Sequence, residues 1–172
     1  NCIMAAVDFD PLLYSPAEEE LNRKILEIAS SLAISKSASL HIVHAWQPFP
    51  ESIMLSRSDN NPGYVSSYIE KERALHQKGI NLLREILKKM ISIENYKSII
   101  PCFHLPKGDP KQKIAEMASN LKADIVVMGT VARTGISGFI IGNTAEAVLS
   151  QLDCSVVAVK PLGFVTPVKI NE

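Results

Sequence analysis

The sequence predicts an α/β fold in which a parallel β-sheet is covered by helices on both faces. Short, nearly continuous apolar runs recur five times along the 172 residues, as expected for strands that are buried on both faces. Segments with apolar residues at helical spacing separate these runs. This alternation is typical of βαβ units, so we expect a single domain built as a doubly wound, three-layer sandwich with five parallel strands.

The amino-terminal half is expected to hold two strands and two helices. The elements are a strand at Ile3–Val7 ended by Asp8, a helix at Ala17–Ser35, a strand at Ser39–Ala45 and a long helix at Tyr64–Met90. The first helix rests on Leu21, Ile25 and Ile28, which recur at helical spacing. Prolines 48, 50 and 62 predict an irregular connection before the long helix.

The carboxyl-terminal half is expected to hold three strands and two helices. The elements are strands at Ser98–Leu105, Asp124–Met128 and Ser155–Lys160, a helix from Pro110 to Leu121 and a short helix after Gly142. Asp109 offers an N-cap before Pro110. Asn143 is expected to cap the last helix, with Glu146 completing a capping box.

Composition excludes several classes of partner. Lysine plus arginine equals aspartate plus glutamate, so the formal net charge is zero and a wide surface for nucleic acid or anionic membrane is not expected. No apolar run reaches the length of a membrane span, and no secretory signal pattern is present. Cys2, Cys102 and Cys154 lie in or beside apolar runs, which predicts buried, reduced thiols in a cytoplasmic protein.

A glycine-rich segment, MGTVARTGISGFIIGNTAE, follows the strand at Asp124–Met128. In a doubly wound sheet, ligands bind beyond the carboxyl ends of the strands, where the strand order reverses. With the order 3-2-1-4-5, the first and fourth strands flank that point, and Asp8 would face Gly129. The glycine segment is therefore the strongest candidate for a binding loop.

The residue types in this loop suit a phosphate-bearing ligand. Gly129 would let the backbone turn tightly, and the helix start at Gly142-Asn143 would favour an anion. Arg133 could pair with a phosphate and Asp8 could accept hydrogen bonds from ribose hydroxyls. The pattern is neither GxGxxG nor GxxxxGK[ST]. A connecting loop with a capped helix and no ligand therefore stays open.

The segment from Asp124 to Pro161, with IMAAVDFD at the start of the chain, resembles the universal stress protein family. Nucleotide-binding members of that family carry G-x2-G-x9-G-[ST] after the fourth strand. GTVARTGIS, GNTAE and VKP are most similar to the second half of a tandem, E-type member. The resemblance implies a Rossmann-like, adenine nucleotide alpha hydrolase-like fold, and a domain at residues 1–172 that is one half of a longer protein.

The resemblance also implies roles for single residues. Asp8 would hold ribose, and Ala45 would lie at the adenine. Met128 and Gly129 would pass beneath the ribose and phosphates. The phosphates would rest on the helix start at Gly142, Asn143 and Thr144.

Two positions depart from the family motif. Ala132 replaces the second glycine, where a Cβ atom would crowd the ligand and strain a positive φ. Asn143 replaces the final serine or threonine, although its amide can still donate to a phosphate. ATP, with Mg²⁺, is therefore a possible ligand.

The remaining polar residues suggest no catalytic centre. His41 and His44 are three apart on one strand, so they point to opposite faces and are not expected to share a metal. His76 is expected to be solvated on the long helix, and His104 could line the cleft. Ser137 and Ser150 have no base beside them in sequence. We therefore expect no enzyme, with a nucleotide hydrolase as the weakest alternative.

Two segments suggest partners or a second ligand. The strand at 155–160 would form a sheet edge, and with the tail Leu162–Val168 it is the expected surface for a homodimer or tandem pseudo-dimer. Phe49, Ile53, Met54 and Leu55 lie between Trp46 and Tyr64. They belong either to the core or to an apolar lid beside the cleft.

Together these observations predict a stress-response regulatory or binding protein with an adenine-nucleotide pocket. The alternatives are an interaction module that acts by dimerisation and a pocket for another small, apolar ligand.

Overall fold

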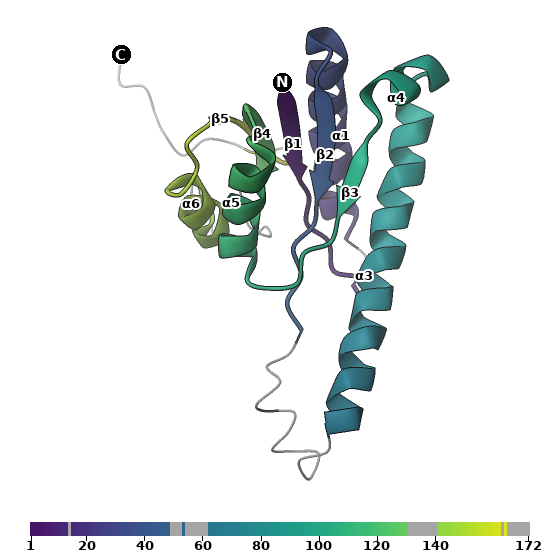
Figure 1. Ribbon diagram of the computed structural model, residues 1–172, viewed down its shortest axis with the longest axis vertical. Coiled ribbons are helices and arrows are strands. Elements are labelled where there is room, and N and C mark those ends of the chain that lie inside the picture. Colours follow the sequence, from purple (N-terminus) through teal and green to yellow (C-terminus); the bar gives the residue numbers. More distant parts are fainter. Residues whose placement is uncertain (14, 49–52, 54–61, 131–140, 163, 165–172) are drawn as a thin grey trace.

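The computed structural model describes residues 1–13, 15–48, 53, 62–130, 141–162 and 164 (Figure 1). The strands are β1 (Cys2–Ala6), β2 (Ser39–Val43), β3 (Cys102–His104), β4 (Ile125–Gly129) and β5 (Ser155–Val159). The helices are α1 (Pro16–Lys36), α3 (Pro62–Met90), α4 (Ile93–Ile99), α5 (Pro110–Leu121) and α6 (Asn143–Leu149).

The strands form one parallel sheet in the order β3-β2-β1-β4-β5, as predicted. In the pairing of β1 with β4, Ala6 lies opposite Met128. The strand order reverses between these two strands, because β2 lies on one side of β1 and β4 on the other. The predicted switch point is therefore confirmed.

Each face of the sheet has its own apolar core. One core joins alternate strand residues such as Ile3 and Ala5 to α1, and Leu83 and Leu87 of α3 pack against it. The other joins Met4, Val43 and Met128 to α5 and α6. Alternation of side chains along each strand produces the two sets. Figure 1 shows α5 and α6 together and far from α3, which extends well beyond the carboxyl ends of the strands.

Local sequence explains most helix boundaries. Ser15 caps α1, because its hydroxyl accepts a hydrogen bond from Glu18 N at 3.3 Å, and Pro16 occupies the first turn. Asp109 caps α5 as predicted, accepting from Lys111 N at 3.0 Å. None of the helices in the described ranges combines the length and apolar character that a membrane crossing needs.

The third strand is shorter than predicted. Ser98 and Ile99 lie in α4, and β3 covers only Cys102–His104. Ser92 caps this unpredicted helix, accepting from Asn95 N at 3.2 Å, and Ile99 is buried against the sheet. The apolar run at 98–105 therefore contains the end of a helix that packs on the core, followed by a short edge strand.

The last helix begins one residue earlier than predicted. Gly142, with φ −79° and ψ 151°, is the N-cap residue, and no side chain caps the helix. The Gly142 carbonyl oxygen accepts the first helical hydrogen bond from Glu146 N at 2.9 Å. Asn143 is therefore the first helical residue, and the predicted Asn143–Glu146 capping box was wrong.

Candidate functional site

Ala45 and Met128, at the switch point, share one face of the sheet, because both belong to the core on the α5 and α6 side. Asp8 follows Val7 beyond the end of β1, and its Oδ1 atom lies 4.0 Å from His44 Nδ1. Asp8, Ala45 and Met128 therefore all lie at the carboxyl ends of β1, β2 and β4, where the strand order reverses.

These three residues differ in what they can offer to a ligand. The Asp8 side chain is 90% exposed, so its carboxylate can reach solvent or a ligand. Ala45 and Met128 are only 6% exposed, so their side chains belong to the core. A ligand at this position would meet the Asp8 carboxylate and the backbone of the other two strands.

A buried asparagine holds the turn that carries Asp8. The Nδ2 atom of Asn22 donates to the Asp8 carbonyl oxygen at 2.7 Å, and Asp8 N donates to Asn22 Oδ1 at 3.2 Å. Asn22 lies on α1 and is 4% exposed. Its position three residues before Ile25, within the apolar stripe, was the sequence signal that the prediction passed over.

Gly129 serves helix packing. It lies within β4, opposite Val159, and is not part of the turn that was predicted for it. A Cβ atom built at Gly129 would lie 3.0 Å from Leu21 Cδ2 and 3.8 Å from Ile25 Cδ1. The close approach of α1 is therefore sufficient to explain the glycine.

Thr130 is a candidate site residue that sequence reasoning missed. Because Met128 faces α5 and α6 and Gly129 faces α1, Thr130 returns to the face that carries Met128. It is 2% exposed, and its Oγ1 atom has no hydrogen-bond partner. In the described part of the chain, only Trp46 Nε1 shares this condition. Buried hydroxyls are normally paired, so an unpaired one at a strand end calls for an explanation.

The backbone around Thr130 joins the fourth and fifth strands to α6. Thr130 N donates to the Val159 carbonyl oxygen at 3.3 Å, and Gly142 N donates to the Thr130 carbonyl oxygen at 2.8 Å. Asn143 and Thr144 follow in the first turn of α6 and are exposed. The strand end and the predicted phosphate-binding residues thus lie directly beside each other. Ala132 and Arg133 lie outside the described residues.

The four histidines form two pairs on opposite faces. His41 and His44 point to opposite faces, as predicted, and each meets a different partner. His41 Nδ1 lies 2.9 Å from His104 Nε2, across β2 and β3. His44 Nε2 lies 2.9 Å from His76 Nδ1, so the expectation that His76 is solvated was wrong. His76 lies on the inner side of α3, where its ring meets Trp46.

Burial shapes the protonation of these histidines. Burial lowers the pKa of His44 to about 4, and the neighbouring His76 acts in the same direction. Burial likewise lowers the pKa values of His41, His76 and His104. The Val7 carbonyl oxygen opposes the shift at His44. All four imidazoles are therefore neutral at pH 7.

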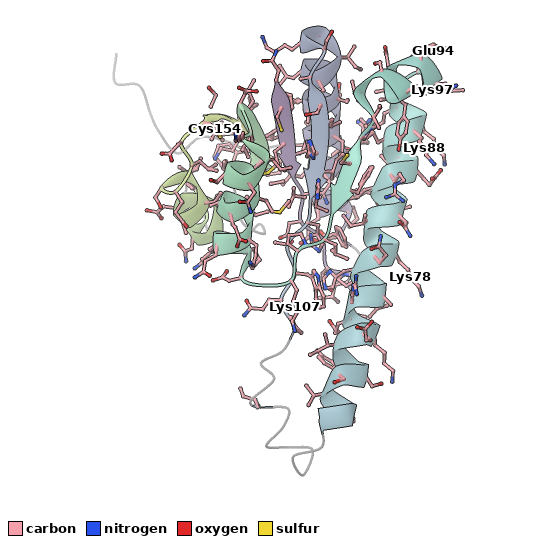
Figure 2. All side chains as sticks on the ribbon, viewed as in Figure 1. Lys78, Lys88, Glu94, Lys97, Lys107 and Cys154 are labelled. Carbon is pink, nitrogen blue, oxygen red and sulfur yellow. The ribbon has the colours of Figure 1, made fainter. Side chains whose placement is uncertain are left out.

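The cysteines lie away from the candidate site. Cys2 is buried, Cys154 is partly buried and Cys102 is exposed on the edge strand β3, so the prediction of burial was wrong for Cys102. None forms a disulfide. Figure 2 shows Cys154 near one end of the sheet and Lys107 near the other, beyond the carboxyl ends of the strands. In the described ranges, no three histidine, cysteine or acidic side chains gather as a metal site.

Of the four apolar residues expected in the core or in a lid beside the cleft, the structure describes only Ile53. Ile53 is 40% exposed, so it is not a core residue. Phe49, Met54 and Leu55 lie outside the described residues. Of the tail predicted to contact a partner, Leu162 is 84% exposed and most of the remainder lies outside the described residues.

Comparison with known proteins identifies relatives of this chain. The profile of the Universal stress protein family matches residues 3–160. Universal stress protein E of Escherichia coli (strain K12) is 31% identical over 158 residues, which cover 91% of this chain and 46% of that protein. The chain thus spans about half the length of the curated relatives of this type that it matches.

Solved structures share the fold. A protein from Pseudomonas aeruginosa UCBPP-PA14, described as a putative universal stress protein, superposes with a TM-score of 0.61 at 29% identity, covering 92% of this chain and 47% of that one. The universal stress protein from Archaeoglobus fulgidus in complex with dAMP superposes with a TM-score of 0.52 at 16% identity, covering 91% and 95%.

Proposed function

Because this chain belongs to the universal stress protein family, we propose that it is a stress-response binding protein with an adenine-nucleotide pocket at the carboxyl ends of β1 and β4. The observation that carries this proposal is the buried, unpaired hydroxyl of Thr130 at the strand end beside Gly142. A ligand oxygen at that position would provide the partner that the protein lacks.

The surrounding groups suit a nucleotide. Asp8, exposed at the end of β1, can accept hydrogen bonds from ribose hydroxyls. Asn143 and Thr144 are exposed at the start of α6, where they can donate to phosphate oxygens. The fold supports this reading, since the relative from Archaeoglobus fulgidus was crystallised with dAMP. ATP with Mg²⁺ is the ligand to test first.

Titration calorimetry of the chain with ATP, with and without Mg²⁺, tests this proposal. We expect binding heat at submillimolar to millimolar ATP and a weaker interaction in Asp8→Asn. Asp153→Asn is the matched control, because Asp153 is an exposed aspartate at the opposite ends of the strands. Absence of heat at millimolar ATP in the unmodified chain would exclude the nucleotide pocket.

Variants that restore the family motif test whether its two altered positions weaken ATP binding. Ala132→Gly and Asn143→Ser together should strengthen ATP binding if these residues weaken an otherwise intact pocket. Unchanged binding in the double variant would show that neither residue limits affinity. Circular dichroism of the double variant provides the check that the fold is preserved.

A second candidate function is assembly through the sheet edge. The edge strand β5 carries exposed Ala158 beside half-buried Val156 and Val157. An apolar edge with unpaired backbone groups can pair with a second domain of the same kind. Analytical ultracentrifugation of Ala158→Lys against the unmodified chain tests this function. A dimer that the substitution dissociates supports it, and a monomer at high concentration contradicts it.

A further inference from the structure

Two imidazoles lie in direct contact between α3 and the ends of β1 and β2, on the side of the sheet where Phe9 packs. His44 follows β2 and is 1% exposed. Its Nδ1 atom lies 3.2 Å from the Val7 carbonyl oxygen, and its Nε2 atom lies 2.9 Å from His76 Nδ1. Both nitrogens of His44 are therefore engaged inside the protein.

The backbone carbonyl determines where the protons lie. A carbonyl oxygen can only accept, so His44 must carry its proton on Nδ1 and donate it to Val7. The Nε2 atom of neutral His44 is then an acceptor, so His76 must donate from Nδ1. One direction of hydrogen bonding, from His76 through His44 to the end of β1, satisfies all of these contacts.

Aromatic packing makes this chain of hydrogen bonds a tie between α3 and the Asp8 turn. The Phe9 ring stacks on His44, with centroids 3.8 Å apart and planes 19° apart. Gly79 of α3 makes room for Phe9, because a Cβ atom there would lie 2.1 Å from Phe9 Cε2. Trp46 lies beside His76 with centroids 5.2 Å apart. The pair thus links α3, β2 and the turn after β1.

The charges around the pair determine which imidazole is protonated first. Burial lowers the pKa of His76, while Glu72 on α3 and Asp10 and Asp8 on the turn oppose that shift. His44 faces His76 on α3. The carboxylate beside His44 is that of Asp8, whose Oδ1 atom lies 4.0 Å from His44 Nδ1. His76 is only half-buried, so it accepts the first proton on Nε2. Its Nδ1 donor to His44 is then retained and becomes charge-assisted.

A second proton has a different effect. It must enter at His44 Nε2, which is the acceptor of the bond from His76. Two N–H groups would then face each other between two positively charged rings, with no acceptor between them. We propose that the His44–His76 pair is a proton-sensitive latch that holds α3 against the Asp8 turn and releases it in acid. Burial supports this order of events, because it lowers the pKa of His44 to about 4.

Nitrogen chemical shifts of the imidazoles test the geometry without any substitution. Long-range ¹H–¹⁵N spectra of the chain at pH 7 should show both His44 and His76 as Nδ1–H tautomers. On acidification, His76 should titrate before His44. An Nε2–H tautomer at His44, or protonation of His44 before His76, would overturn the proposal.

Hydrogen exchange across a pH series tests the release. Amides near Gly79 and Leu83 of α3 should lose protection, relative to amides of α1, with a midpoint near pH 4. In His76→Gln, the amide can reorient to accept from a protonated His44, so the α3-specific loss should disappear. Identical pH profiles for α3 in His76→Gln and the unmodified chain would overturn the proposal.

Trp46, the single tryptophan, offers an independent reporter beside His76. Its fluorescence should decrease as His76 becomes cationic, and His76→Gln should abolish that step. His104→Gln is the matched control, because it breaks the other histidine pair, at the same 2.9 Å separation but on the opposite face. A fluorescence titration altered by His104→Gln and not by His76→Gln would contradict the assignment.

Discussion

The backbone N–H of Gly142 donates to the carbonyl oxygen of Thr130 at 2.8 Å, which joins the start of α6 to the end of β4. The glycine-rich segment therefore leaves and rejoins the described structure at one place. That place carries a buried hydroxyl without a partner and lies at the same edge of the sheet as Asp8, where the strands have their carboxyl ends. The connection is the structural basis for expecting a ligand here.

Thr130→Val should stabilise the unliganded protein and weaken ATP binding. The substitution replaces an unpaired buried hydroxyl by a methyl group of similar size, so we expect a gain of about 1 kcal/mol in the free energy of unfolding. Urea unfolding with and without ATP measures both effects. Thr130→Ser, which keeps the hydroxyl, is the control for binding. A loss of stability in unliganded Thr130→Val would show that the hydroxyl has a structural partner.

Gly129→Ala should destabilise the protein through α1. The added Cβ atom would lie 3.0 Å from Leu21 Cδ2, and we expect a loss of about 1 kcal/mol. In a Leu21→Ala background the same substitution should cost little, because the contacting atoms are gone. A double-mutant cycle by urea unfolding measures this coupling. Equal losses in both backgrounds would mean that α1 is not the constraint.

Gly79→Ala should destabilise α3 although alanine is the better helix former. Propensity alone favours alanine by about 1 kcal/mol. The new Cβ atom, however, would lie 2.1 Å from Phe9 Cε2 and must displace that ring from His44. We expect a net loss of about 2 kcal/mol, and recovery of most of it in Gly79→Ala/Phe9→Ala. Stabilisation by the single substitution would contradict the packing of Phe9 on α3.

The free energy of unfolding should fall as the pH drops below neutrality. His44 has a folded-state pKa of about 4 against an ordinary value of 6.5, so the unfolded chain binds its proton first. Its contribution is complete above pH 6.5 and is lost as the pH approaches 4. Between pH 7.5 and pH 5.0 we expect a loss of about 2 kcal/mol from this residue. Urea unfolding at the two pH values measures it. Equal stability would contradict the burial of a neutral His44.

The strand order, the switch point and the cap of α5 could be predicted from the sequence, because they depend on local patterns. Apolar runs predict buried strands, and Asp109 before Pro110 predicts a helix start. The third strand was predicted to begin too early, because Ile99 is a buried residue of helix α4. An apolar run alone does not distinguish a buried strand from a buried helix. Asn143 was misassigned as a cap because Gly142 already has the extended backbone of that position.

The candidate site was predictable in outline and not in detail. Asp8, Ala45 and Met128 were expected at one edge, and all three lie at the carboxyl ends of their strands, although only Ala45 and Met128 are shown on one face. Asn22 and Thr130 were missed, since a polar residue within an apolar stripe does not reveal its partner and a threonine after a strand carries no distinctive pattern. Their importance depends on burial, which pairs the first with the Asp8 backbone and leaves the second unpaired.

By itself, the sequence determined the parallel α/β sandwich and the family, and it indicated the segment for which we propose a nucleotide pocket. These features follow from periodicity and from a motif within one stretch of chain. Only the tertiary structure decided why Gly129 lacks a side chain and which partners the histidines have. His44 and His76 are separated by 32 residues, and they meet because α3 packs across the end of β2. Contacts of this kind depend on the three-dimensional arrangement of helices and strands, which local sequence patterns do not encode.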